Sequence, residues 1–299
     1  MRLVLTLLVR NEEDILATNI DYHLSRGVEF IIATDNRSED RTPEILERYR
    51  ARGVLRVIEE RSDDYDQQRW VTRMARLAAR EHGADWVINA DADEFWWPKH
   101  AASLPEALRA LPPEVQAGHA ERHDFLPVEG APGASIVHAM TTRKAVSLNA
   151  HGDPLHPKVC HRAHGRIHIG QGNHHVYLRS GPFFRRRRVP SVDAGLEILH
   201  FPLRSYEQFE RKIALGGAAY TRNTSVGRDE GSTWRMLYRR YLEGELSSYF
   251  AEQVPSPEER EEGLAEGRFV LDERLLRYLD GGCGERGSPV APGAPDDGR

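Results

Sequence analysis

The chain of 299 residues has little of several features that define whole classes of protein. Its only cysteines are Cys160 and Cys283, so a disulfide framework is excluded and a cytoplasmic location is expected. It has no apolar run of the roughly 18 residues that a membrane helix needs. Its net charge of −5 argues against a dedicated nucleic-acid-binding protein. We therefore predict an ordinary globular protein with neither a transmembrane segment nor a nucleic-acid partner.

Two further shortages concern the start of the chain and its basic residues. The apolar run over residues 1–9 resembles a signal peptide, but it ends at Arg10 with no small-residue cleavage site, which favours a core strand. Lysine occurs only at positions 99, 144, 158 and 212, whereas arginine is abundant. We interpret this bias as a property of a GC-rich, bacterial genome rather than of function.

The first 100 residues alternate between apolar runs and amphipathic segments. Strands are predicted at 3–9, 30–34, 54–58 and 86–90, with helices over about 12–26, from Pro43 to about 52, and over about 66–82. This alternation predicts an α/β fold with a mostly parallel sheet flanked by helices. The loops at the carboxyl ends of the strands would then meet at one edge, where such sheets bind ligands.

The pattern changes after residue 100. A short helix is predicted over 104–111, and the segment to residue 200 mixes β-like stretches at 135–140, 176–178 and 196–200 with many Gly, Pro and His. Helices are expected again over about 205–220 and 233–252. Residues 281–299 contain almost no apolar side chains, which predicts a disordered tail.

Three acids follow the fourth predicted strand: Asp91, Asp93 and Glu94. Clustered carboxylates are costly unless a positive charge neutralises them, and a divalent cation that also binds phosphate oxygens would do so. A solvated acidic loop is the alternative. Polar residues that follow the first two strands should lie at the same edge, namely Arg10, Asn11, Asp35 and Asn36, although each of these could instead shape a turn or cap a helix.

Four segments resemble glycosyltransferases of the GT-A (Rossmann-like) fold, in particular a family 2-like group: residues 8–16, 34–42, 91–95 and 200–212. The resemblance implies a GT-A-like domain over 1–204, with a nucleotide-binding half (1–100) and an acceptor half (101–204), followed by a helical extension over 205–280. It implies transfer of a sugar from a UDP- or GDP-sugar to the hydroxyl of a glycan, lipid or small molecule.

The resemblance also suggests roles for the residues of the nucleotide-binding half. Asp35 could accept a hydrogen bond from a uracil or guanine N–H, or it could cap the turn before the Pro43 helix. Arg10 could neutralise the diphosphate, Asn36 belongs to the same donor site, and Asn11 either contacts the nucleotide or shapes its loop. A nucleotidyltransferase would instead need a Gly-rich or Lys/Arg-rich phosphate loop after the first strand, which is absent.

A metal site is implied by the Asp-x-Asp motif. Asp93 is expected to bind Mn²⁺ or Mg²⁺ directly, whereas Asp91 would contact the ribose or a metal-bound water, and Glu94 could be structural. His200 could complete the metal shell, which would favour manganese, or could simply pack at a strand end. A non-catalytic protein that binds nucleotide sugars also remains open at this point.

The acceptor half is harder to interpret. Seven histidines lie between positions 151 and 175, but they lack a paired-ligand pattern with cysteine, so an acceptor wall with Lys158 available for phosphate is favoured over a zinc site. An inverting enzyme is expected, and it needs a base. Asp124, His174 and Asp193 are the candidates, whereas a retaining enzyme would need none.

A run of four arginines, residues 185–188, is the strongest local charge in the sequence. Such a run is normally a solvated face. It could instead attract an acidic acceptor or anionic lipid headgroups, which would bring the protein into peripheral contact with a membrane.

Overall fold

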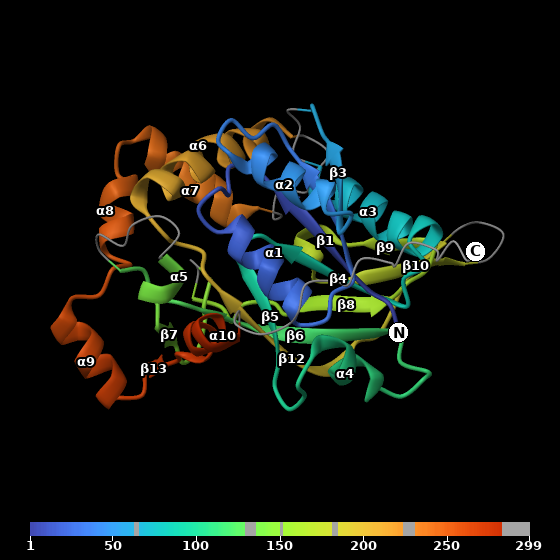
Figure 1. Ribbon diagram of the computed structural model, residues 1–299. Helices are drawn as coiled ribbons and strands as arrows, with labels where there is room; N and C mark the ends of the chain where they lie inside the picture. The colour runs from blue at the N-terminus through green and yellow to red at the C-terminus, as the bar shows by residue number, and fades with distance from the viewer. Residues whose placement is uncertain (63–65, 129–135, 150–151, 181–184, 224–230, 283–299) are drawn as a thin grey trace, which may run out of the picture.

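The computed structural model describes residues 1–62, 66–128, 136–149, 152–180, 185–223 and 231–282. Within them lies an eight-stranded sheet of order β3-β2-β1-β4-β8-β6-β12-β5 (Figure 1). Its strands are β1 (Leu3–Val9), β2 (Phe30–Asp35), β3 (Leu55–Glu59), β4 (Trp86–Asp91), β5 (Glu94–Pro98), β6 (Ala117–Asp124), β8 (Lys158–Arg162) and β12 (Val192–His200).

The sheet is mixed but mainly parallel. β1 pairs in parallel with β2 and β4, β2 with β3, and β6 with β12. β8 runs antiparallel to both of its neighbours, and β5 runs antiparallel to β12. The predicted α/β class, with a mostly parallel sheet flanked by helices, is therefore confirmed.

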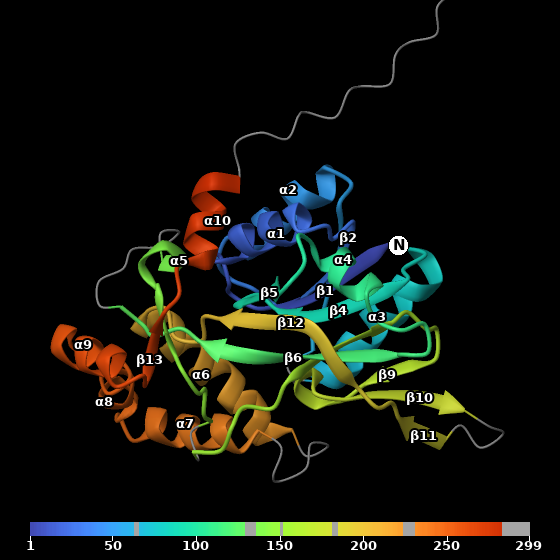
Figure 2. The same cartoon turned by 90° about the horizontal axis from the view of Figure 1, so that it is seen from below.

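Helices cover both faces of the sheet (Figure 2). α1 (Leu16–Ser25) and α2 (Thr42–Ala51) lie on one face, and α3 (Gln67–Glu81) lies on the other. The side chains of β1 alternate between the two resulting cores, since Leu5 packs on the side of α1 while Val4 packs with Trp70 of α3. Both faces of β1 are thus buried, which explains why every residue of the strand except Thr6 is apolar.

The second half of the chain adds smaller elements. These are α4 (Leu104–Arg109), α5 (Ile136–Ala139), β7 (Thr142–Lys144), β9 (Ile167–Ile169), the 3₁₀ helix η2 (Gln171–Asn173), β10 (Val176–Ser180) and β11 (Arg185–Arg188). The strands β11, β10 and β9 form a separate antiparallel sheet that extends away from the body beside α3 (Figure 2). The β-like stretch predicted at 135–140 was wrong in its described part, where residues 136–139 form α5; β-branched residues are a weak guide in so short a segment.

The C-terminal segment is mostly helical and consists of α6 (Tyr206–Arg222), α7 (Ser232–Leu242), α8 (Leu246–Ala251), α9 (Pro257–Ala265), β13 (Phe269–Leu271) and α10 (Arg274–Gly282). The single helix predicted over 233–252 is wrong, because Gly244 adopts a φ of 75° and separates α7 from α8. α10 returns to the main body, where Leu275 joins the core that contains β1.

Residues 283–299, most of the tail predicted to be disordered, lie outside the described residues. No helix in the described part of the chain is both long and apolar enough to cross a bilayer. The cytoplasmic location stays a prediction.

Candidate active site

A cleft of about 1020 Å³ opens at the carboxyl ends of β1, β4, β6 and β12 and is bordered by α6 and α7. The parallel strands bring Arg10, Asp93, Asp124 and His200 to this one edge, although they lie far apart in the sequence. This is the convergence expected of loops at the carboxyl edge of a parallel sheet.

The Asp-Ala-Asp segment forms the tight turn between β4 and β5, and its two acids point to different partners. Asp91 Oδ2 lies 2.6 Å from Lys158 Nζ, and the same ammonium lies 2.9 Å from Glu94 Oε1. Asp93 is 2 % exposed, and its Oδ2 accepts a hydrogen bond of 2.8 Å from Lys212 Nζ. Each aspartate of the motif therefore pairs with a different lysine, Asp91 with Lys158 and Asp93 with Lys212.

Asp93 is ionised despite its burial. Burial alone would raise the pKa of this carboxyl, but Lys212, His200 and Arg204 together hold it well below its usual range. Arg204 Nη1 lies 3.7 Å from Asp93 Oδ2, on the same side as Lys212. The Oδ2 atom of Asp93 thus contacts the cationic side chains of Lys212 and Arg204, whereas its Oδ1 atom faces His200 Nε2 at 3.7 Å.

His200 is oriented by Asp124. Its Nδ1 lies 2.7 Å from Asp124 Oδ1, and when Nδ1 carries the ring proton it donates to that carboxylate. The lone pair of Nε2 is then directed toward Asp93. Metal-binding histidines are commonly held in this way by a carboxylate on the other ring nitrogen.

The side chains at this position fit a metal cation that is bound by two protein ligands rather than three. Asp93 Oδ1 and His200 Nε2 converge, but the carboxylate of Asp91 is turned to Lys158. Among the described residues, no three His, Cys, Asp or Glu side chains come together as a metal centre. The described histidines of residues 152–175 likewise form no zinc site, and His151 lies outside the described residues.

Arg204 connects the loops after β1 and β12. It is 1 % exposed; its Nε donates to Asp14 at 2.6 Å and its Nη2 donates to Glu12. Sequence reasoning gave no role to Arg204 or Lys212, although both lie in the segment 200–212. The scarcity of lysine was the available signal, because three of the four lysines, at positions 144, 158 and 212, line the cleft.

The residues after β1 and β2 line the cleft or shape its loops, and some of them do both. Arg10 and Asn36 line the cleft, as does Asn11. Arg10 is half-buried and has no ion pair within the described residues, and burial together with Arg37 lowers the pKa of its guanidinium. Asn11 adopts a φ of 55°, and its Oδ1 accepts a hydrogen bond of 2.8 Å from the Glu39 N–H, so it fixes the loop geometry.

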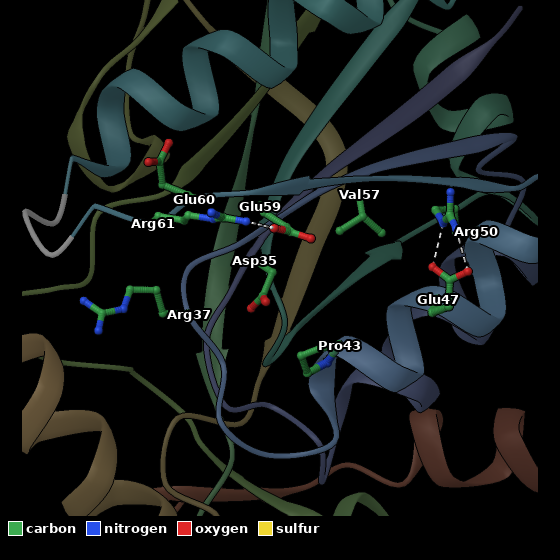
Figure 3. Close-up of a pocket in the computed structure, with 9 residues that line it drawn as sticks. All are labelled: Asp35, Arg37, Pro43, Glu47, Arg50, Val57, Glu59, Glu60 and Arg61. Atoms are coloured by element: carbon green, nitrogen blue, oxygen red, sulfur yellow. Dashed lines mark hydrogen bonds and ion pairs between the residues drawn. The ribbon is translucent and has the colours of Figure 1, made fainter.

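Asp35 lines a neighbouring cavity of about 650 Å³ (Figure 3). Figure 3 shows it near Arg37, Glu59 and Arg61. Its Oδ1 accepts a hydrogen bond of 2.5 Å from Ser38 Oγ, and burial raises the pKa of the carboxyl despite that bond. In this conformation Asp35 closes the turn that precedes α2.

The three candidate bases lie in different environments. His174 lines the cleft, and its Nδ1 lies 2.9 Å from the Pro157 carbonyl oxygen. Asp124 also lines the cleft but is bonded to His200. Asp193 lies at the opposite end of β12 from His200, where it forms an ion pair of 2.9 Å with Lys99. Only two of the three candidates are therefore brought to the cleft.

Part of the chain is similar to a known family of proteins. Residues 6–146 match glycosyltransferase family 92. The match covers β1 to β7 and includes the Asp-Ala-Asp turn, and it confirms the predicted enzyme class, a glycosyltransferase. The assignment to a family 2-like group stays a prediction. No curated protein sequence matches the chain.

Two solved structures illustrate the distant likenesses. S. aureus TarS 1–349 in complex with UDP is 14% identical, with 86% of this chain and 77% of that chain covered and a TM-score of 0.39. Glucosyl-3-phosphoglycerate synthase from Mycobacterium tuberculosis, in complex with Mn²⁺, UDP and glucosyl-3-phosphoglycerate, is 20% identical, with 43% and 45% covered and a TM-score of 0.29. Likenesses of this size carry no argument about activity.

Proposed function

We propose that this protein is a GT-A-type, metal-dependent, inverting glycosyltransferase that moves a sugar from a UDP- or GDP-sugar to a hydroxyl acceptor. The observation that carries the proposal is the position of Asp93. It lies in the cleft, within the segment that matches a glycosyltransferase family, and its Oδ1 faces His200 Nε2 at 3.7 Å. The donor side of the reaction is assigned to this part of the cleft.

Asp93 Oδ1 and His200 Nε2 are the proposed ligands of Mn²⁺ or Mg²⁺, and the imidazole favours manganese. The bound ion supplies Lewis-acid stabilisation of the departing diphosphate. Lys212 and Arg204 hold the other oxygen of Asp93, so the carboxylate keeps one orientation. Arg10 lines the cleft, forms no ion pair in the described part of the chain, and is placed to bind phosphate oxygens.

His174 is the proposed base. Its Nδ1 donates to the Pro157 carbonyl, which leaves the lone pair of Nε2 to accept the proton of the acceptor hydroxyl. Burial, followed by the charge of Lys158, lowers the pKa of His174 to about 3, so the ring is neutral at neutral pH and its Nε2 lone pair is unprotonated, although so low a pKa makes it a weak base in the free protein. Attack by the activated hydroxyl then inverts the anomeric carbon.

The proposal is tested with a panel of UDP- and GDP-sugars, scored for release of nucleoside diphosphate with Mn²⁺, with Mg²⁺ and after chelation. We expect one donor class to turn over, with loss of activity on chelation and in Asp93→Asn. Asp193→Asn is the matched control, because it removes a carboxylate that does not line the cleft. Thermal unfolding of each variant separates loss of activity from loss of fold.

Other outcomes would contradict the proposal in distinct ways. Release of pyrophosphate instead of nucleoside diphosphate would indicate a nucleotidyltransferase. Binding of donor with no turnover for any acceptor would indicate a non-catalytic nucleotide-sugar-binding protein. Equal activity in Asp93→Asn and wild type would show that the carboxylate of Asp93 is not needed for the reaction.

The base is tested separately. His174→Ala should lower kcat by a factor of about 10² to 10⁴, the usual contribution of general-base catalysis, with little change in donor affinity. The anomeric configuration of the product, read by NMR, should be inverted relative to the donor. A retained configuration, or a His174→Ala enzyme with wild-type kcat, would remove the base from the mechanism.

A further inference from the structure

A long segment of the chain has no acidic residue. Between Asp153 and Asp193 the sequence contains seven arginines, one lysine and six histidines but no aspartate or glutamate, in a protein whose net charge is −5. This segment supplies β8 and the small sheet of β9, β10 and β11. Its positive charge therefore has no compensating carboxylate in the same segment.

The register of the small sheet gathers this charge on one face. Arg179 lies opposite Arg186, and Tyr177 lies opposite both Arg188 on β11 and His168 on β9. Alternate residues of a strand point to the same side, and directly paired residues of neighbouring strands share a face. These five side chains therefore lie on one face of the sheet.

Helix α3 extends the same charged region. Arg76 donates from Nε to the Ile167 carbonyl oxygen of β9 at 2.7 Å, which fixes its stem beside the sheet. Burial and then the charges of Arg179, Arg80 and Arg186 lower the pKa of Arg76. We refer to the set of Arg76, Arg80, Arg179, Arg186 and Arg188 as the arginine face.

The arginine face has no counter-charge among the described residues, where none of its members forms an ion pair. Arg179 Nε of this face and Nε2 of His168, which lies on the same side of the sheet, are buried and have no hydrogen-bond partner in that part of the chain. His168 is 7 % exposed. Like charges held together repel one another, so this arrangement becomes favourable when an anion binds.

The arginine face continues into the cleft. Tyr177, which shares the face, also lines the cleft, as does the neighbouring His175. Arg188 lies directly opposite Tyr177 in the strand register, so it lies close to the cleft lining, and burial followed by the charge of Arg188 lowers the pKa of His175. Arg186 lies two residues from Arg188 on β11, a separation of about 7 Å. Arg76 and Arg80 on α3 continue the positively charged surface beyond Arg186.

We propose that the arginine face binds a polyanionic acceptor, a chain that bears phosphate or carboxylate groups at intervals, and guides its hydroxyl end to the cleft. Guanidinium groups pair with both kinds of anion through two parallel hydrogen bonds. The proposal rests on the proposed function, because it names the chemical class of the hydroxyl acceptor. Continuity with the cleft favours this occupant over a membrane surface, which would need no path to the active site.

The small sheet offers a matched pair of variants for the test. Arg186→Glu/Arg188→Glu reverses two charges on the arginine face, whereas Arg185→Glu/Arg187→Glu reverses two exposed charges of the same strand that point to its other side. Both double variants change the net charge equally. Binding of the full chain to long-chain inorganic polyphosphate and to poly-glutamate is measured at several salt concentrations, alongside binding to phosphatidylglycerol vesicles.

We expect the wild-type protein to bind at least one of the two polymers with an affinity that falls as salt rises. Arg186→Glu/Arg188→Glu should weaken this binding by about tenfold or more, and Arg185→Glu/Arg187→Glu by less than about twofold. The polymer that binds identifies phosphate or carboxylate as the recognised group. In a donor assay, the polymer should compete with an acceptor and not with the nucleotide sugar.

Three results would overturn the proposal: no binding of either polymer, equal losses in the two double variants, or binding to vesicles alone, which would indicate a membrane surface. Failure of the proposed function is recognised separately. In that case no nucleotide sugar is turned over, whether or not the two polymers bind.

Discussion

At the scale of single residues, Lys212 is the side chain that links the C-terminal helices to the Asp-Ala-Asp turn. It lies on α6, and its ammonium bonds to a carboxylate 119 positions earlier in the chain. Its side chain keeps 27% of its surface exposed in the cleft, whereas Lys158 keeps 3%. Lys158 is therefore placed to hold the turn, and Lys212 is placed to meet a bound donor as well.

Lys212→Ala should reduce turnover by about two to three orders of magnitude, because it removes a positive charge from the proposed site of negative charge on the leaving group. Initial rates with the donor identified in the panel measure the effect. Lys99→Ala is the control, since Lys99 pairs with Asp193 away from the cleft. Similar rates in the two variants would argue against a role for Lys212 beyond packing.

Arg204→Met should destabilise the protein by about 3–5 kcal/mol, because a buried cation is lost while Glu12, Asp14 and Asp93 stay in place. Urea unfolding followed by tryptophan fluorescence measures the change. Arg268→Met, which removes exposed ion pairs and an exposed contact with the Phe269 ring, should unfold nearly like the wild type. A small effect of Arg204→Met would mean that the three acids find other partners.

At the scale of secondary-structure elements, His23 joins α1 to β5. Its Nε2 accepts a hydrogen bond of 3.3 Å from the Trp96 N–H, so Nδ1 carries the proton and donates to the Asn19 carbonyl oxygen at 2.9 Å. Burial lowers the pKa of His23 to about 4 from an ordinary value of 6.5. The folded protein thus holds this imidazole neutral at the junction.

The free energy of unfolding should therefore fall with acidification between pH 6.5 and pH 4. Above 6.5 the ring is neutral in both states, but below it the unfolded chain takes up a proton that the folded chain binds only near pH 4. This one group contributes up to about 3 kcal/mol to the change. Denaturant unfolding at a series of pH values should show a shallower slope in His23→Gln, and an unchanged slope would exclude this group.

The sequence predicts those helices and strands whose conformation is determined by residues within the same segment. β1 and α3 are foreseen because apolar runs and helical periodicity lie within the segments themselves. The break at Gly244 is missed although glycine is its local signal, and the helix α5 is missed because packing decides the conformation of so short a segment. Asp93 and His200 are foreseen as a pair through a resemblance. The contacts of Arg204 with Glu12, 192 positions away, leave no periodic trace in the sequence.

At the scale of the whole molecule, the two ends of the described chain share one core. Tyr278 of α10 hydrogen-bonds to Ser25 of α1 at 2.8 Å, and its ring lies 3.8 Å from the Arg26 guanidinium carbon. The described part of the C-terminal segment therefore begins over the cleft with α6 and ends with α10 against the first helix.

A single cooperative unfolding transition is expected as a result, with coincident midpoints by circular dichroism and tryptophan fluorescence. Tyr278→Ala should lower the midpoint without splitting the transition, because it removes an aromatic and cation–π contact worth about 1–2 kcal/mol. Tyr241→Ala, on α7, is a comparison at a site outside this core. Two separate transitions in the wild type would show that the C-terminal helices unfold on their own.

The distribution of lysine has a practical consequence for chemical labelling. Apart from the N-terminus, an amine-reactive reagent meets only four primary amines, and three of them border the cleft. Lys158 is only 2% exposed, so acylation followed by mass spectrometry should modify mainly Lys99, Lys144 and Lys212, and donor bound in the cleft should protect Lys212 while leaving Lys99 reactive. The rarest basic residue of the chain thus serves as a built-in footprinting probe for substrate occupancy.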